Sequence, residues 1–522
     1  MSVRHATLDL LRRLGMTTVF GNPGSTELRF LRDWPSDFRY VMGLHEGPVV
    51  AMADAYAQLT RNAAFVNLHS AGGVGNAMGA IFTAARNYAP LVVVAGQQTR
   101  GMLSSDPFLY AEDATMLPRP YVKWALEPAR AADVPAAILR AYTIAMQRPY
   151  GPTFVSVPED DWDQEAALPA VRRVLDEPAP DDAVLAELAA ALELSRAPAL
   201  VVGSGVDRDG ASADVVRLAE ALDAPVWASA LASRCGFPED HRLFAGALAR
   251  IRGGVADALR GHDLVLVLGA PVFNYHIHQE GAFLPDGTTL FAVTDDPRLA
   301  ASAVAGTSIV AALGPTLRSL VSRVTPRPAV RAARKPVAIE ANPRLTIETL
   351  LETVAATLPP GAIVVEEAPS THTFLHDLLP LQPGRFLTAA SGSLGYGLAA
   401  AAGAALAAPG QRVVAIIGDG SAHYAISGLW TAARHRLPVT YLIVNNEGYG
   451  AMRSFAELIG STSSPDFSIP GIDFRALARG YGLPALRVDR PEDLAAACEE
   501  SFRADGPSLI DAVVDAAARK LF

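Results

Sequence analysis

Short runs of apolar, β-branched residues recur along the chain and alternate with longer stretches whose apolar residues keep a helical spacing. The runs are apolar almost throughout, which is typical of parallel strands that are buried on both faces. Regular alternation of such strands with helices predicts an α/β fold built on parallel sheets. Strands are expected at residues 18–20, 64–68, 91–95, 199–202, 263–268, 289–293, 385–388, 413–417 and 439–444.

Two proline-containing segments interrupt this pattern. Residues 167–183 are rich in Pro, Asp and Ala, and residues 325–342 are polar, basic and broken by proline, as expected of linkers. A chain of 522 residues is long enough for about three domains. We therefore expect three doubly wound parallel-sheet domains, at residues 1–175, 182–324 and 343–522.

Neither the N-terminal segment nor the longest weakly polar run is predicted to enter a membrane. Residues 7–14 alternate apolar and charged side chains as an amphipathic helix does, unlike a signal peptide. The longest weakly polar run, residues 394–409, is too short and too rich in Gly and Ala to cross a bilayer. A soluble protein without a membrane partner is expected.

The charge and cysteine content narrow the possible partners. Lys and Arg number 44 against 54 Asp and Glu, so the net charge is −10, and basic runs are missing. Nucleic acid and anionic membranes are therefore poor candidates as partners. Cys235 and Cys498 lack metal-binding spacing, so zinc and a disulfide framework are both improbable, and the reducing cytoplasm is the expected location.

The strongest chemical motif follows the predicted strand 413–417. Gly418-Asp419-Gly420-Ser421 comes directly after it, and Asn445-Asn446 follows strand 439–444, with a crossover helix expected at residues 425–436 between the two. Both clusters fall at carboxyl ends of strands, where open α/β sheets bind ligands. Glycines allow close approach to a phosphate, and a carboxylate with an amide oxygen suits Mg²⁺ rather than Zn²⁺. The spacing indicates a site for magnesium and a diphosphate, although a lone GDG would be only a turn.

This spacing resembles the thiamine diphosphate-dependent 2-oxo acid decarboxylase family, whose signature is GDG followed by NN. The resemblance implies a pyrimidine-binding, a middle and a diphosphate-binding domain, with thiamine diphosphate and Mg²⁺ as cofactors. It implies that Asp419, Asn446 and the carbonyl of Gly448 bind the metal. Cofactor contacts are implied for Gly392, Leu394, Gly420, Ser421 and Tyr449, with Leu394 supporting the bend of the cofactor; an ordinary core leucine is the alternative.

The same resemblance assigns a role to Glu46. The cofactor reacts through C2 of its thiazolium ring, and this chemistry requires a carboxylic group beside N1′ of its pyrimidine. Glu46 is expected to close an apolar strand and open an Ala-rich helix in the first domain, where the family places that acid. The alternative is a first-turn glutamate that is favoured only by the helix dipole.

Further runs, among them FGNPGS, NLHSA and GAPVF, are similar to the benzoylformate decarboxylase branch. By that similarity His69 and His276 transfer protons, as imidazoles near neutral pH can. Ser25, also a candidate helix N-cap, would contact the substrate carboxylate. A lone histidine is more often structural, and the division of roles between the two is open. The substrate pocket would be lined by Leu109, Ala451 and Phe455.

The expected reaction is non-oxidative decarboxylation of an aromatic 2-oxo acid to an aldehyde and CO₂. Benzoylformate is the first candidate substrate, which would place the enzyme in mandelate catabolism. Family members build each site between two chains. A homodimer is therefore the smallest assembly expected, and a homotetramer is the expected final assembly. A carboligase or lyase, a decarboxylase of branched 2-oxo acids and a non-catalytic paralogue are the alternatives; no clear flavin-binding signature supports an acetohydroxy acid synthase. The chain departs from the family pattern at Glu447 and at residues 104–110 and 366–370.

Overall fold

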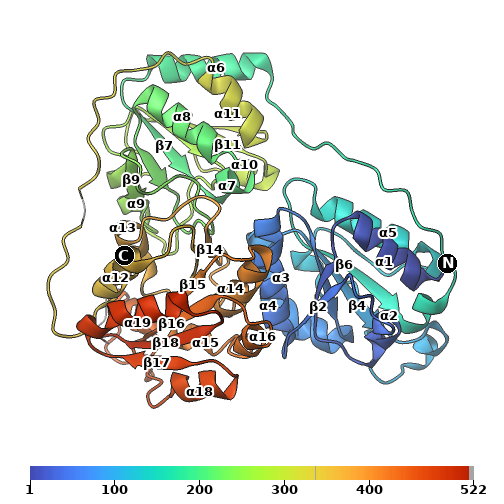
Figure 1. Ribbon diagram of the computed structural model, residues 1–522. Helices are drawn as coiled ribbons and strands as arrows, with labels where there is room; N and C mark the ends of the chain where they lie inside the picture. Colours follow the sequence, from blue (N-terminus) through green and yellow to red (C-terminus); the bar gives the residue numbers. More distant parts are fainter. Residues whose placement is uncertain (336, 516–522) are drawn as a thin grey trace.

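Three parallel sheets of six strands each organise the molecule, which we describe from a computed structural model covering residues 1–335 and 337–515. Figure 1 shows the sheets in three separate bodies with helices on both faces, joined by two long extended segments. Every pairing between neighbouring strands is parallel. The predicted α/β fold class is confirmed. Residues 516–522, the end of the third predicted domain, lie outside the described residues, as does residue 336 in the second predicted linker.

The first sheet has the order β2-β1-β3-β4-β6-β5, and its central strands are buried throughout. The buried runs that predicted strands at 64–68 and 91–95 therefore form its centre. The first domain consists of α1 (Val3–Arg13), β1 (Thr18–Gly21), α2 (Leu28–Leu31), β2 (Arg39–Met42), α3 (Glu46–Thr60), β3 (Ala64–Leu68), α4 (Ser70–Arg86), β4 (Leu91–Gln97), β5 (Ala125–Leu126), α5 (Val134–Ala145) and β6 (Thr153–Pro158).

The second sheet has the order β12-β11-β10-β7-β8-β9, so the chain reverses its winding direction between β7 and β10. It consists of α6 (Asp182–Leu194), β7 (Pro198–Val202), α7 (Ser204–Arg208), α8 (Ser212–Leu222), β8 (Val226–Ala228), β9 (Phe244–Ala247), α9 (Arg252–Ala258), β10 (Leu264–Leu268), β11 (Thr289–Thr294), α10 (Pro297–Ser302), β12 (Thr307–Val310) and α11 (Leu313–Val321).

The third sheet has the order β14-β13-β15-β16-β18-β17. Its elements are α12 (Ile347–Thr357), β13 (Ile363–Glu367), α13 (His372–Leu378), β14 (Phe386–Thr388), α14 (Gly397–Ala407), β15 (Val413–Gly418), α15 (Asp419–Ala422), α16 (Gly428–Arg434), β16 (Val439–Asn445), α17 (Gly450–Leu458), α18 (Phe474–Gly480), β17 (Ala485–Val488), α19 (Pro491–Arg503) and β18 (Ser508–Val513).

The crossover helix between β15 and β16 is shorter than the expected span of 425–436. Residues 423–427 form turns, and α16 begins only at Gly428. Tyr424 packs against Gly395, where a Cβ would come within 3.0 Å of it. Arg436 takes a left-handed conformation (φ +48°), which prevents the helix from continuing.

One hydrophobic core is shared by the first and third domains. It runs through α3 and α14, whose backbones approach so closely that a Cβ on Gly403 would lie 2.0 Å from the carbonyl oxygen of Met52. Figure 1 shows α3, α4 and α14 side by side at the centre of the molecule. The two domains therefore form one packed unit within the chain.

Within the residues that the structure describes, none of the helices has the length and apolar character needed to cross a bilayer.

Candidate active site

A cavity of about 230 Å³ lies beyond the carboxyl ends of β13, β15 and β16. Parallel strands bring their ends to one edge of the sheet, so the loops after these three strands meet there. The cavity unites His276 of the middle domain with all the predicted site residues of the third domain. These are Gly392, Leu394, Asp419, Gly420, Ser421, Asn446, Gly448, Tyr449, Ala451 and Phe455.

The predicted metal ligands lie together at the base of this cavity. Asp419 is buried, and its two carboxylate oxygens accept hydrogen bonds from the N–H groups of Gly420 (2.7 Å) and Gly448 (2.9 Å). Oδ1 of Asn446 is buried without a hydrogen-bond partner. Burial raises the pKa of the Asp419 carboxyl. A bound cation would reverse that shift and satisfy the orphaned amide oxygen, so these residues fit a metal ion.

The composition of the ligand set indicates the type of metal. In the part of the chain that the structure describes, no cluster of three or more His, Cys, Asp or Glu side chains could hold a metal on its own. One carboxylate and one amide oxygen leave several coordination positions open. This suits a hard cation such as Mg²⁺, which usually completes its octahedron with phosphate oxygens and water.

Glycines shape the wall around these ligands. A Cβ on Gly420 would lie 2.7 Å from the ring of Tyr449, and one on Gly450 would lie 2.5 Å from the Asn446 side-chain nitrogen. The absence of side chains at both positions lets the Tyr449 ring and the Asn446 amide approach the GDGS turn. The pattern is that of a narrow cradle for a phosphate group.

The turn that carries Gly392 and Leu394 is held by a carboxylate that the sequence did not identify. Glu367 is buried at the end of β13 and accepts hydrogen bonds from the N–H groups of Gly395, Tyr396 and Gly397 at the start of α14. Burial raises its pKa to about 8, although these bonds favour the charged form. Within residues 366–370, where the sequence predicted a departure from the family pattern, Glu367 is therefore a buried acid that caps the start of α14.

His276 enters the cavity from the loop after β10. Its ring stands edge-on to the ring of Phe455, with centroids 4.8 Å apart. Its backbone N–H donates to the carbonyl oxygen of Arg250. Burial, and next the positive charge of Arg250, lower the pKa of the His276 imidazole. This histidine is therefore neutral at neutral pH and can accept a proton.

Glu46 lies in the first domain, away from this cavity. It is the first residue of α3, separated from the end of β2 by a short turn, rather than the residue that closes the strand as expected. The side-chain amides of Asn22 and Asn76 donate to its two oxygens, at 3.3 and 3.1 Å. The positive end of α3 also favours the carboxylate.

His69, at the end of β3, is held by a second acid that the sequence did not reveal. Oε2 of the buried Glu27 lies 2.9 Å from Nδ1 of His69. The Glu27 carboxylate also accepts from the N–H groups of Gly24 (2.7 Å) and Gly96 (3.0 Å) and from the hydroxyl of Thr26 (2.7 Å). Glu27 follows Gly24 by three residues, the spacing of a capping box, which was the available signal.

Ser25 and Leu109 complete the predicted set. Ser25 is exposed in the turn after β1, but it is the first residue of a short 3₁₀ segment (Ser25–Glu27) whose N-cap is Gly24, so its expected N-cap role is wrong. Leu109 is half-buried in the irregular segment after β4 and adopts a left-handed φ of +67°.

Within one chain, the predicted site residues of the first domain lie outside the cavity. Among the described residues, none from the first domain lines the cavity. The loop before α14 contacts the last turns of α4, where Thr83 and Ser391 share a hydrogen bond of 2.8 Å, whereas His69 precedes the first turn. At 1.5 Å per residue, the thirteen steps from Ser70 to Thr83 span about 20 Å.

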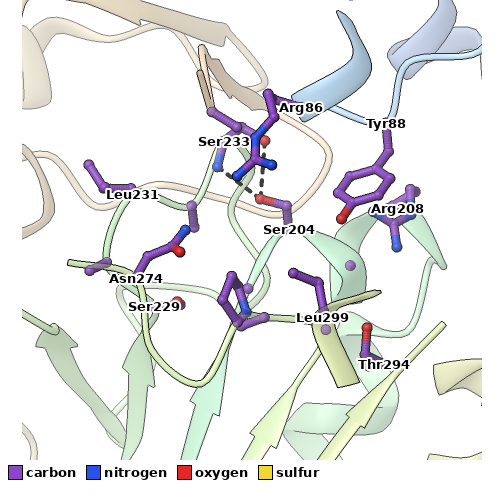
Figure 2. Close-up of a pocket in the computed structure, with 18 residues that line it drawn as sticks. Arg86, Tyr88, Ser204, Arg208, Ser229, Leu231, Ser233, Asn274, Thr294 and Leu299 are labelled. Atoms are coloured by element: carbon purple, nitrogen blue, oxygen red, sulfur yellow. Dashed lines mark hydrogen bonds between the residues drawn. The ribbon is translucent and has the colours of Figure 1, made fainter. Parts of the chain in front are cut away.

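A second, smaller cavity lies where the middle sheet reverses its winding, between the ends of β7 and β10. Figure 2 shows Tyr88 beside Arg208, whose guanidinium carbon lies 4.5 Å from the centre of the Tyr88 ring. It also shows the hydrogen bond between the hydroxyls of Ser204 and Ser233. Dinucleotides bind at such switch points in α/β sheets. This cavity measures about 60 Å³, and it is lined by residues of all three domains, among them Tyr88, Arg208 and Ala390.

Comparisons with known proteins agree along the whole chain. Three thiamine pyrophosphate enzyme models match: the N-terminal TPP binding domain at residues 1–116, the central domain at 185–320 and the C-terminal TPP binding domain at 370–512. The chain is 45% identical over 518 residues to benzoylformate decarboxylase of Pseudomonas aeruginosa, covering 98% of each. It is 27% identical to the acetolactate synthase isozyme 1 large subunit of Escherichia coli over 98% of this chain and 93% of that relative.

Solved structures give the same result. The thiamine diphosphate-dependent 4-hydroxybenzoylformate decarboxylase of Rhodococcus jostii RHA1 superposes with a TM-score of 0.96 at 43% identity, covering 100% of both chains. The benzoylformate decarboxylase of Polynucleobacter necessarius superposes with a TM-score of 0.96 at 41% identity, covering 99% of both.

Proposed function

This chain belongs to the thiamine pyrophosphate enzyme family, and from that premise we propose that it decarboxylates benzoylformate or a close aryl relative to the aldehyde and CO₂. The observation that carries the proposal is the cavity in which a cation site, formed by Asp419 and Asn446, faces an apolar wall with a neutral histidine, His276, and Phe455. A small 2-oxo acid with an aromatic ring suits both halves of that cavity.

The metal-binding half would hold the cofactor. Asp419, Asn446 and the carbonyl of Gly448 would bind Mg²⁺ together with oxygens of a diphosphate, and Gly420 and Ser421 would line the phosphate cradle. When bound, thiamine diphosphate supplies a nucleophilic carbon and an electron sink for loss of CO₂. Gly392 and Leu394, whose turn is fixed by the Glu367 cap, would bind the rest of the cofactor together with Tyr449 from the loop after β16.

The acid and the two histidines would handle protons. Glu46, held by Asn22 and Asn76, would bind the pyrimidine end. Because Nδ1 of His69 faces the Glu27 carboxylate, Nδ1 carries a proton and Nε2 remains to exchange protons with substrate or product. His276, neutral through burial, would accept a proton on the other side of the site.

The remaining predicted residues would bind the substrate. The Ser25 hydroxyl is exposed and would donate to the substrate carboxylate. Ala451 and Phe455 line the cavity, and Leu109 would complete the aryl pocket from the first domain.

The site would be completed by a second copy of the chain. Since none of the described first-domain residues lines the cavity of its own chain, a partner would bring its first domain to that cavity. We expect a homodimer in which each active site takes Glu46, His69, Ser25 and Leu109 from one chain and the cavity from the other. A dimer of dimers, giving a homotetramer, is the expected final assembly.

A carboligase or lyase is the main alternative function. It is supported by the acetolactate synthase relatives, which share the cofactor-binding domains. The lower identity to those relatives, 27% against 45% for benzoylformate decarboxylase, favours the decarboxylase. A decarboxylase of branched 2-oxo acids would need only a different pocket shape, because one methylene group in a pocket changes binding by about 1–3 kcal/mol.

A panel assay separates these functions. Purified protein with thiamine diphosphate and Mg²⁺ is given benzoylformate, 4-hydroxybenzoylformate, a branched 2-oxo acid or two equivalents of benzaldehyde, and CO₂, aldehyde and ligated product are measured. We expect CO₂ and benzaldehyde from benzoylformate, and loss of activity on chelation that Mg²⁺ restores. Ligation from two aldehydes without CO₂ release from any 2-oxo acid would contradict the proposal.

The cellular setting and the domain limits complete the proposal. Cys235 and Cys498 are free and buried, in keeping with a cytoplasmic enzyme of mandelate catabolism, where oxidation of mandelate supplies benzoylformate.

We propose domain limits of 1–175, 182–324 and 343–522. Limited proteolysis should cut first between residues 171 and 181, which are mostly exposed and lack helix and strand.

A further inference from the structure

The segment that carries Leu109 is held by several side-chain hydrogen bonds to its backbone and by one backbone hydrogen bond, from the N–H of Tyr110 to the carbonyl oxygen of Pro107. Residues 108–111, which we call the wall segment, contain no helix or strand. Phe108 is 85% exposed and Met102, earlier in the same loop, is 46% exposed. Within the wall segment only Ala111 is buried, so the position of the rest depends mainly on polar contacts.

Gln97, the last residue of β4, holds one end of the wall segment. Its side chain is buried; Oε1 accepts from the N–H of Ala111 (3.0 Å) and Nε2 donates to the carbonyl oxygen of Ala111 (2.8 Å). The side-chain amide thus pairs with Ala111 in both directions, as a peptide group does in a sheet ladder. The amide of Gln98 donates to the carbonyl oxygen of Phe108 at 2.6 Å.

Ser70 holds the middle of the wall segment and lies directly after His69. Its buried hydroxyl donates to the carbonyl oxygen of Leu109 at 2.7 Å. Both residues adopt left-handed backbone conformations, with φ of +44° at Ser70 and +67° at Leu109. Such conformations are costly for residues other than glycine, and they persist where the surroundings enforce them, commonly at functional sites.

We propose that Ser70 and Gln97 are positioning residues that set substrate selectivity by fixing the Leu109 wall relative to His69. The inference rests on the proposed function and adds to it the device that favours aromatic substrates. A rigid wall gains dispersion contacts with a flat aryl ring, whereas a short aliphatic 2-oxo acid does not reach it. Loosening the wall therefore weakens binding of aromatic substrates selectively.

The test compares two substrates in matched variants. Ser70→Ala removes the hydroxyl without adding volume, and Gln98→Ala loosens the same segment from a partly exposed position if Ser70→Ala folds poorly. Ser105→Ala is the control, because its hydroxyl bonds the carbonyl oxygen of Met102 in the exposed part of the same loop. The kcat and KM for benzoylformate and for 2-oxobutanoate are measured for each holoenzyme.

The ratio of kcat/KM for benzoylformate over 2-oxobutanoate should fall roughly 5- to 10-fold in Ser70→Ala, as expected for loss of one hydrogen bond. The fall should come mainly from a higher KM for benzoylformate, and Ser105→Ala should keep the wild-type ratio. An unchanged ratio, or equal losses of kcat for both substrates, would overturn the positioning role. Wild-type protein that releases no CO₂ from any 2-oxo acid would instead overturn the proposed function.

Discussion

Glu27 is a buried side chain that would prepare the imidazole of His69 for its proposed role in proton transfer. Three donors besides His69 hold its carboxylate, so the acid is fixed before any substrate arrives. A fixed acceptor at Nδ1 selects the tautomer and the orientation of the ring. The arrangement serves the same purpose as an acid that orients a general base in other enzymes.

Replacement of Glu27 by glutamine should therefore lower kcat about 10- to 100-fold, part of the usual contribution of general acid–base catalysis. The side-chain amide keeps the size of the acid but can present an N–H to Nδ1, which disturbs the tautomer. Steady-state kinetics of Glu27→Gln and of the exposed control Glu112→Gln check this. A Glu27→Gln enzyme within two-fold of wild type would remove the orienting role.

The charge near His276 gives a prediction about pH. Burial and the Arg250 cation both lower the pKa of His276, so its neutral form persists to lower pH than usual. If the neutral imidazole is the working form, Arg250→Gln raises this pKa and moves the acid limb of kcat/KM to higher pH. A pH profile measures the shift, with Arg260→Gln as an exposed control. An acid limb that stays in place or moves to lower pH would exclude this role for His276.

At the scale of elements, the contact between α3 and α14 joins the two cofactor-binding domains of one chain. Gly403→Ala places a methyl group against the α3 backbone at Met52, which has no flexible side chain to give way. We expect a loss of about 1–3 kcal/mol of unfolding free energy, the usual penalty for overpacking. Denaturant unfolding measures it.

Gly480→Ala in α18 is the matched control, because a Cβ there meets no atom within 4 Å. Alanine should leave stability unchanged or raise it by up to about 1 kcal/mol, through helix propensity. Equal behaviour of the two variants would show that the α3–α14 approach is not tight.

The same helix pair contains a buried acid with a shifted pKa. Asp54 on α3 accepts hydrogen bonds from Gln58, Asn87 and Tyr396, yet burial raises its pKa from 3.8 to about 7. Because the pKa of Asp54 is higher in the folded than in the unfolded state, protonation of Asp54 stabilises the fold. This stabilisation is complete below about pH 4 and disappears as the pH rises through about 7.

Asp54→Asn should therefore flatten the dependence of Tm on pH between about 4 and 7, as measured by circular dichroism melts. Glu367, whose pKa is raised to about 8, contributes equally to the pH dependence of stability in the wild type and in Asp54→Asn. An unchanged slope would show that Asp54 does not take up its proton in this range.

Local sequence signals predicted the elements well where burial is continuous. The apolar runs at 64–68, 413–417 and 439–444 became central strands because a strand buried on both faces needs no alternation. The extent of α16 was wrong because the turn at residues 423–427 packs on Gly395, a contact distant in sequence. Asn76 and Glu367 were not predicted for the same reason, since their partners, Glu46 and residues 395–397, are distant in sequence. Glu27 was missed although its spacing from Gly24 is a local signal.

At the scale of the whole molecule, the three sheets divide the work. The third domain forms most of the cavity, with Asp419 and Asn446 in its lining, the middle domain supplies His276, and Glu46 and His69 lie in the first domain, outside the cavity of the same chain. The motifs predicted the residues that line the cavity, but whether the first-domain residues complete the site stays a prediction, and no residue pattern shows which copy of the chain would supply them. That information lies in the packing of α4 against the loop before α14.

Complementation between two inactive variants tests the shared site most directly. Glu46→Gln and Asp419→Asn should each lose about 10²- to 10⁴-fold in activity, the range typical of a missing acid–base or electrostatic group. Co-expressed with different tags and purified through both, the mixed assembly should recover about a quarter to a half of wild-type activity, because one site in each hybrid dimer has both groups intact. If the hybrid is no more active than the two parents, each chain builds its own site and the two-chain account is wrong.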